Sequence, residues 1–321
     1  MSDRPVVLVG RKVPPAVEER LKRDYRPRLN EDDRIYARDE LMALADGAEA
    51  ILPCHTEHLS AQVIARLPSS VRAICSYSVG VDHVDLNAAK ARGIIVTNTP
   101  DVLSDATAEI AMLLLIGAAR RASEGDALVR TGQWRSWSLE FMVGVQVTGK
   151  RLGIVGMGRI GQLLARRARG FDMAVHYHNR RRLDAEREAG AVYHPTLQDL
   201  LPHSDFLSLH CPATAETHHL LNARRIALMP DGAVVVNTAR GTIVDDAALI
   251  AALRSGKLAA AGLDVFNNEP DINPGYRELT NTLLLPHIGS ATHETRDAMG
   301  FRALDNMDAI FAGREPRDRV G

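Results

Sequence analysis

The sequence predicts an α/β protein with two doubly wound parallel sheets. Short apolar runs alternate with polar or glycine-bearing turns and then with helical patterns along most of the chain, which is the order of βαβ units. One of these units, residues 152–161, carries an apolar strand directly into a GxGxxG loop and a helical pattern. The chain has 321 residues, of which 45% are apolar, and this is enough for the cores of two domains.

The C-terminal part shows the alternation most clearly. Apolar runs bounded by turn residues follow one another from Arg151 onward. They predict six parallel strands, at residues 152–155, 173–177, 205–209, 233–236, 261–265 and 283–285. Six parallel strands form a doubly wound sheet with helices on both faces.

The N-terminal part repeats the pattern more weakly and predicts a second, smaller α/β domain. Its strands are expected at residues 6–9, 50–52, 71–75 and 94–96. Residues 104–121 predict a buried helix between the two parts, with Ser104 as its N-cap and Asp105 in its first turn. A last amphipathic helix, at residues 291–312, is expected to return to the N-terminal domain.

These elements predict one discontinuous and one continuous domain. The discontinuous domain comprises residues 1–99 and 288–321, and the continuous domain, residues 100–287, is expected to bind a dinucleotide. Both are Rossmann-like or flavodoxin-like, and the active site is expected in the cleft between them.

The glycine loop after the first strand of the continuous domain predicts the dinucleotide site. Gly156, Gly158 and Gly161 allow a tight turn and a close approach of the backbone to a pyrophosphate. The N-terminus of the next helix attracts the same anion.

The residues that follow the second strand indicate which nicotinamide cofactor binds. An NAD-binding unit usually has a carboxylate about 20 residues after the loop, for the ribose 2′-hydroxyl. This chain has Asn179 there, followed by Arg180, Arg181 and Arg182. Because a guanidinium suits a 2′-phosphate, we expect NADP(H) as the preferred cofactor and NAD(H) as the alternative. A solvated charge run before a helix is the other explanation of these arginines.

The composition excludes several classes of partner. The balance of 39 Lys and Arg against 40 Asp and Glu provides no basic field for nucleic acid. Cys54, Cys75 and Cys211 are widely separated and predict neither a disulfide framework nor a metal site, so a cytosolic protein is expected. The apolar runs at residues 6–9 and 110–119 are too short for a signal peptide or a membrane span.

Polar side chains follow the later strands, where ligands bind in an open parallel sheet. Arg240 follows the fourth predicted strand, Asp264 and Glu269 follow the fifth, and His287 follows the sixth. An arginine, a glutamate and a histidine therefore converge on the edge that carries the glycine loop. Each of them alone also fits a structural role, but their convergence there favours a chemical one.

These side-chain types suit the reduction of a 2-oxo acid by hydride. A guanidinium can form two parallel hydrogen bonds to the carboxylate and carbonyl of the substrate. An imidazolium can protonate the carbonyl oxygen as hydride reaches the carbon, and a neighbouring carboxylate stabilises its charged form.

The chain resembles the D-isomer-specific 2-hydroxyacid dehydrogenase family over nearly its whole length. The matching stretches, besides the glycine loop, are SVGVDHVD at 78–85, TNTP at 97–100, NTARG at 237–241 with VD at 244–245, GLDVF at 262–266 with EP at 269–270, and LPHIGSAT at 285–292. The resemblance implies an oxidoreductase that is usually a homodimer and whose cofactor domain is inserted into the substrate domain.

The same resemblance implies roles for individual residues. Arg240 binds substrate, Glu269 pairs with His287, and His287 is the acid/base. Leu52, Tyr77, Val79 and Gly80 are expected to join Arg240 and His287 around the substrate, with the Val79 and Gly80 amides cradling its carboxylate. The expected cofactor contacts are Thr107, Gly156, Gly158, Arg159, Ile160, Gly161, Asn179, Arg180, Arg181, Cys211, Pro212, Thr217, Thr238, Ala239, Asp264 and Gly289.

Within the family, the basic residues after the second strand favour a reductase of glyoxylate and hydroxypyruvate that prefers NADPH. Trp134 and Trp137 lie on the segment that, by resemblance, reaches toward the partner's active site, and ordinary dimer packing explains them equally well. The alternatives are a dehydrogenase of the phosphoglycerate, hydroxyphenylpyruvate or 2-ketogluconate type and, more distantly, a corepressor-like protein that senses the dinucleotide. Glu269 argues against a formate dehydrogenase, which pairs a glutamine with the histidine.

Overall fold

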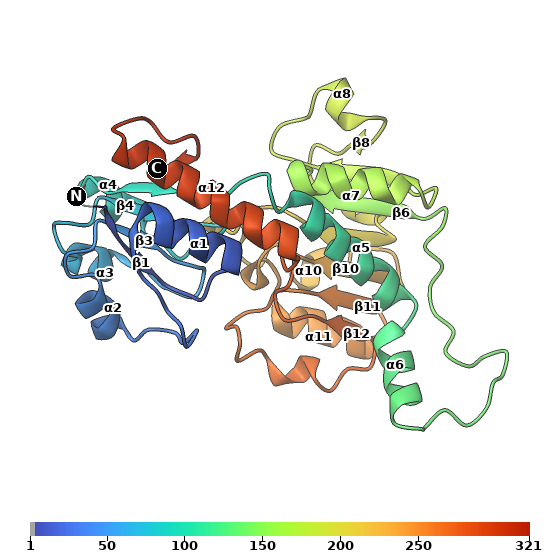
Figure 1. Ribbon diagram of the computed structural model, residues 1–321. Coiled ribbons are helices and arrows are strands. Elements are labelled where there is room, and N and C mark those ends of the chain that lie inside the picture. Colours follow the sequence, from blue (N-terminus) through green and yellow to red (C-terminus); the bar gives the residue numbers. More distant parts are fainter. Residues whose placement is uncertain (1–3) are drawn as a thin grey trace. The chain divides into compact units, whose positions relative to one another are not determined.

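The structure, a computed structural model, describes residues 4–321 and divides into two compact units. The first unit contains the chain up to Leu103 together with Ser290–Gly321, and the second unit is the continuous stretch Ser104–Gly289. Figure 1 shows the helices and strands of each.

The first unit is built on a six-stranded sheet with the order β13-β5-β4-β3-β1-β2. Its strands are β1 (Val6–Val9), β2 (Arg26–Arg28), β3 (Ala50–Leu52), β4 (Ala73–Cys75), β5 (Ile95–Thr97) and β13 (Arg319–Val320). The first five are parallel in the flavodoxin-like order 2-1-3-4-5, and β13 pairs antiparallel with β5. The four predicted strands are confirmed within two residues. The short edge strands β2 and β13 were not predicted, because neither carries an apolar alternation.

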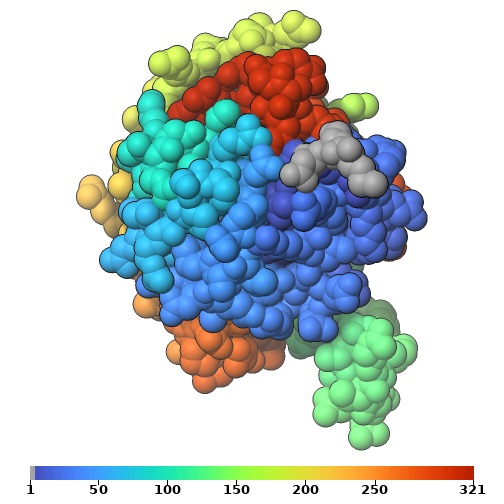
Figure 2. Space-filling view, turned by 60° about the vertical axis from the view of Figure 1, so that its left-hand side comes forward, coloured from blue at the N-terminus to red at the C-terminus, as the bar shows by residue number. Residues whose placement is uncertain are grey.

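Five helices of the first unit are described: α1 (Pro15–Asp24), α2 (Arg38–Leu44), α3 (Ala61–Arg66), α4 (Leu86–Ala91) and α12 (His293–Phe311). The C-terminal helix α12 packs against α1, β4 and β5, and in Figure 2 it is the red helix above the blue and cyan residues of this unit. A Cβ at Gly300 would lie 2.4 Å from a methyl group of Val17, so only glycine allows α12 to approach α1 this closely.

The second unit is built on a parallel sheet of seven strands with the order β12-β11-β10-β9-β6-β7-β8. Its strands are β6 (Arg151–Val155), β7 (Ala174–His178), β8 (Val192–Tyr193), β9 (Phe206–Leu209), β10 (Ala233–Asn237), β11 (Leu258–Leu263) and β12 (Thr282–Leu284). The six predicted strands are confirmed, but the expected total of six was wrong. β8 has only two residues and lies at the edge, so it lacks the apolar run that reveals a buried strand. With β8 the order is that of a Rossmann fold, 3-2-1-4-5-6, with one further strand.

Helices cover both faces of this sheet. They are α5 (Ser104–Ala119), α6 (Ala122–Arg130), α7 (Arg159–Arg169), α8 (Ala185–Glu188), α9 (Leu197–Leu200), α10 (Ala223–Ile226) and α11 (Asp246–Ser255), with 3-10 turns η1 (Leu201–His203), η2 (Ala215–Thr217), η3 (Gly241–Ile243) and η4 (Pro274–Tyr276). Ser104, predicted as an N-cap, is instead the first helical residue of α5.

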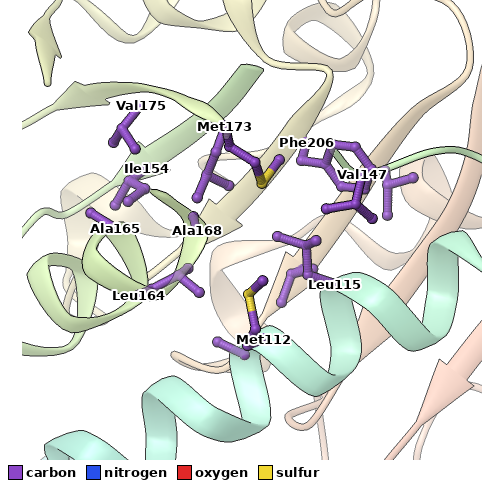
Figure 3. Close-up of a cluster of buried hydrophobic side chains, with 14 of the residues drawn as sticks. Met112, Leu115, Val147, Ile154, Leu164, Ala165, Ala168, Met173, Val175 and Phe206 are labelled. Atoms are coloured by element: carbon purple, nitrogen blue, oxygen red, sulfur yellow. The ribbon is translucent and has the colours of Figure 1, made fainter. Parts of the chain in front are cut away.

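Helix α5 and helix α7 pack side by side on one face of the sheet. Figure 3 shows Met112 and Leu115 of α5 and Leu164 of α7 pointing into the same apolar cluster as Ile154 and Phe206 of the strands. This burial explains why α5 is apolar nearly all round. Among the described residues, no helix has both the length and the apolarity that a bilayer crossing requires.

Candidate active site

The predicted cofactor residues of the second unit gather at one edge of its sheet. All its strand pairs are parallel, so the carboxyl ends of the strands share that edge. The strand order reverses between β6 and β9, where ligands bind in sheets of this kind. The residues at or near this edge are Gly156, Gly158, Arg159, Ile160, Gly161, Asn179, Arg180, Arg181, Cys211, Pro212, Thr217, Thr238, Ala239, Asp264 and Gly289, with Thr107 supplied by α5.

The three glycines of the loop differ in how much space surrounds them. Gly156 has a φ of +91°, and a Cβ on it would lie 2.6 Å from the backbone nitrogen of Cys211. A Cβ on Gly161 would lie 2.7 Å from the carbonyl oxygen of Gly156, so this glycine lets α7 pack closely on the loop. At Gly158, the residue before α7, a Cβ would meet nothing within 4 Å. No side chain caps α7, so its N-terminus and the space beside Gly158 fit a pyrophosphate.

Asn179 connects the end of β7 to the glycine loop. Its Oδ1 accepts a 2.7 Å hydrogen bond from the backbone N–H of Met157. An amide therefore occupies the position where an NAD-binding unit has a carboxylate, and it brings no negative charge against a 2′-phosphate.

The three arginines after Asn179 differ in their surroundings. Arg182 forms a bidentate ion pair with the buried Glu188, at 2.7 Å and 3.0 Å. Arg180 and Arg181 are exposed and form no hydrogen bond or ion pair with any residue that the structure describes. Hydrogen bonding from Thr214 lowers the pKa of Glu216, and the charge of Arg180 adds to this effect. The guanidinium groups of Arg180 and Arg181 are therefore accessible to a ligand, whereas that of Arg182 is engaged by Glu188.

The loop after β10 presents Arg240. Asn237 holds this loop on both sides, since its Oδ1 accepts from the Ala239 N–H at 3.0 Å and its Nδ2 donates to the Arg240 carbonyl at 2.9 Å. A Cβ on Gly241 would lie 1.9 Å from the carbonyl carbon of Phe266. The loop of Arg240 therefore packs backbone to backbone against the loop that leads to Glu269.

Glu269 and His287 form a pair. Glu269 Oε2 lies 2.7 Å from His287 Nδ1, and Glu269 Oε1 accepts a 2.7 Å hydrogen bond from the Phe266 N–H. The side chains of His287 and Glu269 are 28% and 26% exposed, so a ligand can reach them. His287 has a φ of +55°, which is costly for a residue with a Cβ, and its N–H donates to the Asp264 carbonyl.

Asp264 ties the end of β11 to the segment after β12. Its carboxylate accepts 2.7 Å hydrogen bonds from the N–H groups of Ile288 and Gly289, and Thr107 of α5 donates to the Gly289 carbonyl at 3.1 Å. Burial raises the pKa of Asp264. These contacts bring three predicted cofactor residues, Thr107, Asp264 and Gly289, to one place.

The predicted substrate residues of the first unit lie at the end of β3 or after the end of β4. Leu52 is fully buried in the core of this unit, and the hydroxyl of the buried Tyr77 donates to the carbonyl of Arg296. The backbone N–H groups of Val79 and Gly80 have no hydrogen-bond acceptor among residues 4–321. Two adjacent N–H groups of this kind fit a carboxylate.

Sequence reasoning missed His210 and Glu188. His210 follows β9 directly, with Nε2 2.8 Å from Ser208 Oγ and Nδ1 3.4 Å from Thr238 Oγ1. Burial lowers its pKa to about 4. The rule that selected Cys211 would also have selected His210, whereas nothing in the sequence pattern indicates that Glu188 is buried.

The comparison with protein families decides the assignment. Residues 112–289 match the model described as D-isomer specific 2-hydroxyacid dehydrogenase, NAD binding domain, and they lie within the second unit. The chain belongs to the D-isomer specific 2-hydroxyacid dehydrogenase family. It is therefore an NAD(P)-dependent 2-hydroxyacid dehydrogenase, as the glycine loop and the strand-end residues predicted.

Similar proteins cover nearly the whole length of this 2-hydroxyacid dehydrogenase. A glycerate dehydrogenase from Hyphomicrobium methylovorum is 45% identical over 311 residues, covering 96% of this chain and 97% of the relative. A glyoxylate reductase from Thermococcus litoralis is 41% identical over 322 residues, with coverage of 99% and 97%. An NADPH-dependent glyoxylate/hydroxypyruvate reductase from Sinorhizobium meliloti, solved with NADP and malonate, is 34% identical with a TM-score of 0.85 and coverage of 99% and 97%.

Proposed function

We propose that this dehydrogenase reduces glyoxylate and hydroxypyruvate to the corresponding 2-hydroxy acids, prefers NADPH, and uses His287 as its acid/base. The observation that carries the proposal is the 2.7 Å contact between Glu269 and His287 at the sheet edge that also carries the glycine loop. The relatives named glyoxylate reductase, glycerate dehydrogenase and glyoxylate/hydroxypyruvate reductase support this choice of substrates.

The proposed reaction consumes one 2-oxo acid, one NADPH and one proton and releases one 2-hydroxy acid and NADP⁺. The bound cofactor supplies the hydride that reaches the carbonyl carbon. His287 donates the proton to the carbonyl oxygen from Nε2, since Nδ1 faces Glu269. Glu269 keeps the imidazole oriented and stabilises its protonated form. Reduction needs His287 protonated and oxidation needs it neutral, so reduction is expected to be faster at lower pH and oxidation at higher pH.

Three groups are proposed to hold the substrate and the nicotinamide. The Arg240 guanidinium binds the substrate carboxylate and carbonyl oxygen through two parallel hydrogen bonds. The N–H groups of Val79 and Gly80 bind the carboxylate. Asp264 holds the carboxamide of the nicotinamide, and Thr107 lies near the cofactor.

The preference for NADPH is proposed from the residues after β7. Asn179 replaces a carboxylate, and the exposed Arg180 and Arg181 offer guanidinium groups to the 2′-phosphate. The solved Sinorhizobium meliloti relative is described as NADPH-dependent, which supports this preference.

We also propose that the enzyme is a homodimer in the cytosol. Helix α6 and the segment that follows it carry apolar side chains that are more than half exposed, namely Val129, Trp134, Trp137, Leu139 and Val143. In Figure 2 part of this segment appears as the green lobe. A second copy that covers these side chains would remove a large apolar surface from water. The three cysteines are unpaired, which suits a reducing compartment.

The experiment that tests the function compares kcat/KM for five acids with NADPH and with NADH. The acids are glyoxylate, hydroxypyruvate, pyruvate, 2-ketogluconate and hydroxyphenylpyruvate, so the result also ranks the alternatives within the family. His287→Gln is expected to lower kcat by about 100-fold or more while the protein stays folded. Near-normal turnover in a folded His287→Gln variant contradicts the proposed acid/base.

A further inference from the structure

Three side chains of the second unit close a hydrogen-bonded clamp beside the proposed 2′-phosphate site. Tyr177 of β7 is fully buried, and its hydroxyl donates to Glu188 Oε1 at 2.6 Å while accepting from the Leu183 N–H at 3.0 Å. Glu188, the last residue of α8, has a side chain that is only 9% exposed and accepts both hydrogen bonds of Arg182. One buried carboxylate therefore joins a strand, a loop and a short helix.

The clamp holds one end of the segment that carries Arg180 and Arg181. The other end is fixed at Asn179, which accepts from the Met157 N–H of the glycine loop through Oδ1 and from the Tyr193 hydroxyl at 3.4 Å through its carbonyl. Only Arg180 and Arg181 lie between the two fixed ends, and both are exposed. The segment is thus too short and too well held for its backbone to move far.

The clamp also engages Arg182, so that its guanidinium group does not face the proposed 2′-phosphate site. Both hydrogen bonds of Arg182 point to Glu188, and the guanidinium lies 5.8 Å from the centre of the Tyr193 ring. Hydrogen bonds from Arg182 and Tyr177 hold the pKa of Glu188 at about 2, so the carboxylate stays charged in the working pH range. Arg182 is therefore a part of the scaffold and does not compete for the phosphate.

We propose that Glu188 and Tyr177 are positioning residues for cofactor selectivity, because they hold the Arg180–Arg181 segment in the conformation that binds a 2′-phosphate. This inference rests on the proposed preference for NADPH. Its physical basis is preorganisation: guanidinium groups on a loop that is already ordered lose less conformational entropy when the phosphate binds. Tyr177 and Glu188 themselves touch neither cofactor nor substrate in this proposal.

The test uses Tyr177→Phe, which removes the hydroxyl without changing any charge, and Arg182→Lys, which keeps the charge but cannot form the bidentate pair. Each is expected to raise KM for NADPH and the Kd for 2′,5′-ADP about 5- to 10-fold. This corresponds to the free energy that roughly one hydrogen bond contributes to ordering the segment. kcat at saturating NADPH, KM for NADH and the Kd for 5′-AMP are expected to stay within about twofold, since none of them depends on a 2′-phosphate contact.

Tyr25→Phe is the matched control, because Tyr25 is also a buried tyrosine whose hydroxyl donates to a carboxylate, that of Asp308 in the first unit. We expect Tyr25→Phe to lower the free energy of unfolding by a similar amount but to leave the Kd for 2′,5′-ADP unchanged. If Tyr177→Phe and Arg182→Lys bind 2′,5′-ADP as the wild type does, or if they weaken 2′,5′-ADP and 5′-AMP equally, the clamp has no role in selectivity.

The wild type and the double variant Arg180→Ala with Arg181→Ala separate this inference from the proposed function. A wild type that does not prefer NADPH contradicts both proposals. A preference that disappears in the double variant but survives in Tyr177→Phe and Arg182→Lys contradicts the clamp alone. If the double variant, Tyr177→Phe and Arg182→Lys all lose the preference for NADPH, both proposals are supported. If Tyr177→Phe and Arg182→Lys lose this preference but the double variant keeps it, the clamp proposal is overturned, because Arg180 and Arg181 are then not the residues that the clamp positions.

Discussion

Glu269 and His287 lie 18 residues apart in the sequence, and their side chains meet at 2.7 Å between Oε2 and Nδ1. Glu269 is held from its other oxygen by the Phe266 N–H, and His287 is held through its own N–H by the Asp264 carbonyl. Both residues are therefore oriented by the ends of neighbouring strands, β11 and β12, and the sheet itself sets the geometry of the pair.

Glu269→Gln should keep the shape of this pair while removing its charge. A neutral amide provides no negative charge beside the imidazolium that donates the proton, so we expect kcat for reduction to fall about 10- to 100-fold. The measurement is kcat in both directions. A variant whose kcat matches that of the wild type would show that the charge of Glu269 is not used.

Arg240→Lys tests the bidentate contact proposed for the substrate. A lysine keeps the positive charge but offers no planar fork, so kcat/KM for glyoxylate should fall about 10- to 100-fold while KM for NADPH stays nearly constant. The control is Arg254→Lys, at an exposed arginine of the same unit that pairs with Glu278. Equal kinetics in the two variants would exclude a bidentate role for Arg240.

Replacing both Arg180 and Arg181 by alanine should erase the preference for NADPH. Each charge-assisted hydrogen bond to a phosphate contributes about 1.5 to 3 kcal/mol, so the ratio of kcat/KM for the two cofactors should drop by at least tenfold. Arg187→Ala, at an exposed arginine of α8, is the control and should leave the ratio unchanged. A surviving preference in the double variant would assign selectivity to other residues.

Substitution by alanine should affect stability at Gly156 and cofactor binding at Gly158. At Gly156 a methyl group would collide with Cys211 and meet an unfavourable φ, so Gly156→Ala should lower the free energy of unfolding by about 1 kcal/mol or more. At Gly158 the methyl group fits within the protein but fills the space proposed for the pyrophosphate. Gly158→Ala should therefore keep the thermal midpoint and raise KM for NADPH about tenfold or more, and a normal KM would place the phosphates elsewhere.

Three partly or fully buried histidines of the second unit, His176, His194 and His210, should make stability depend on pH. Burial lowers the pKa of His210 to about 4, and burial together with neighbouring histidines lowers the pKa of His176 and His194. Unfolded histidines take up protons below about pH 6.5, before the folded ones do, so the free energy of unfolding should fall between about pH 6.5 and 4, by at most about 1.4 kcal/mol per pH unit for each group.

Urea unfolding at about pH 7, 6 and 5 measures this dependence. His210→Gln should flatten the curve, whereas His58→Gln, at an exposed histidine of the first unit, should not. Carboxylates with lowered pKa values, such as Glu188, lose their contribution only at still lower pH. A free energy of unfolding that is constant from pH 7 to pH 5 would show that folding does not lower the pKa of these histidines.

The sequence predicts the strands of the two sheets wherever they are buried on both faces. Apolar runs such as Ala233–Asn237 must lie inside, and the residue that follows each run is then placed at the shared edge by the parallel topology. This is why the pattern of apolar runs is enough to select Arg240, Glu269 and His287. The catalytic and binding roles of these residues stay predictions until the variants are measured.

The features that the sequence did not reveal depend on contacts across the fold. The strand β8 is two residues long and pairs with β7 at the sheet edge, where Tyr193 lies opposite Tyr177. Likewise, Arg182 looks like its two neighbours in the sequence, and only the buried position of Glu188 distinguishes it. The local sequence cannot distinguish three consecutive arginines, because the partner of Arg182 comes from another element.

The division of the chain into one continuous and one interrupted unit has a consequence for folding during synthesis. The second unit, Ser104–Gly289, is complete in sequence before α12 and β13 have been made. The first unit has to wait, because α12 covers β4 and β5, and β13 pairs with β5. We therefore expect the inserted unit to fold first on the ribosome, while the strands made first remain without their covering helix until α12 has been synthesised.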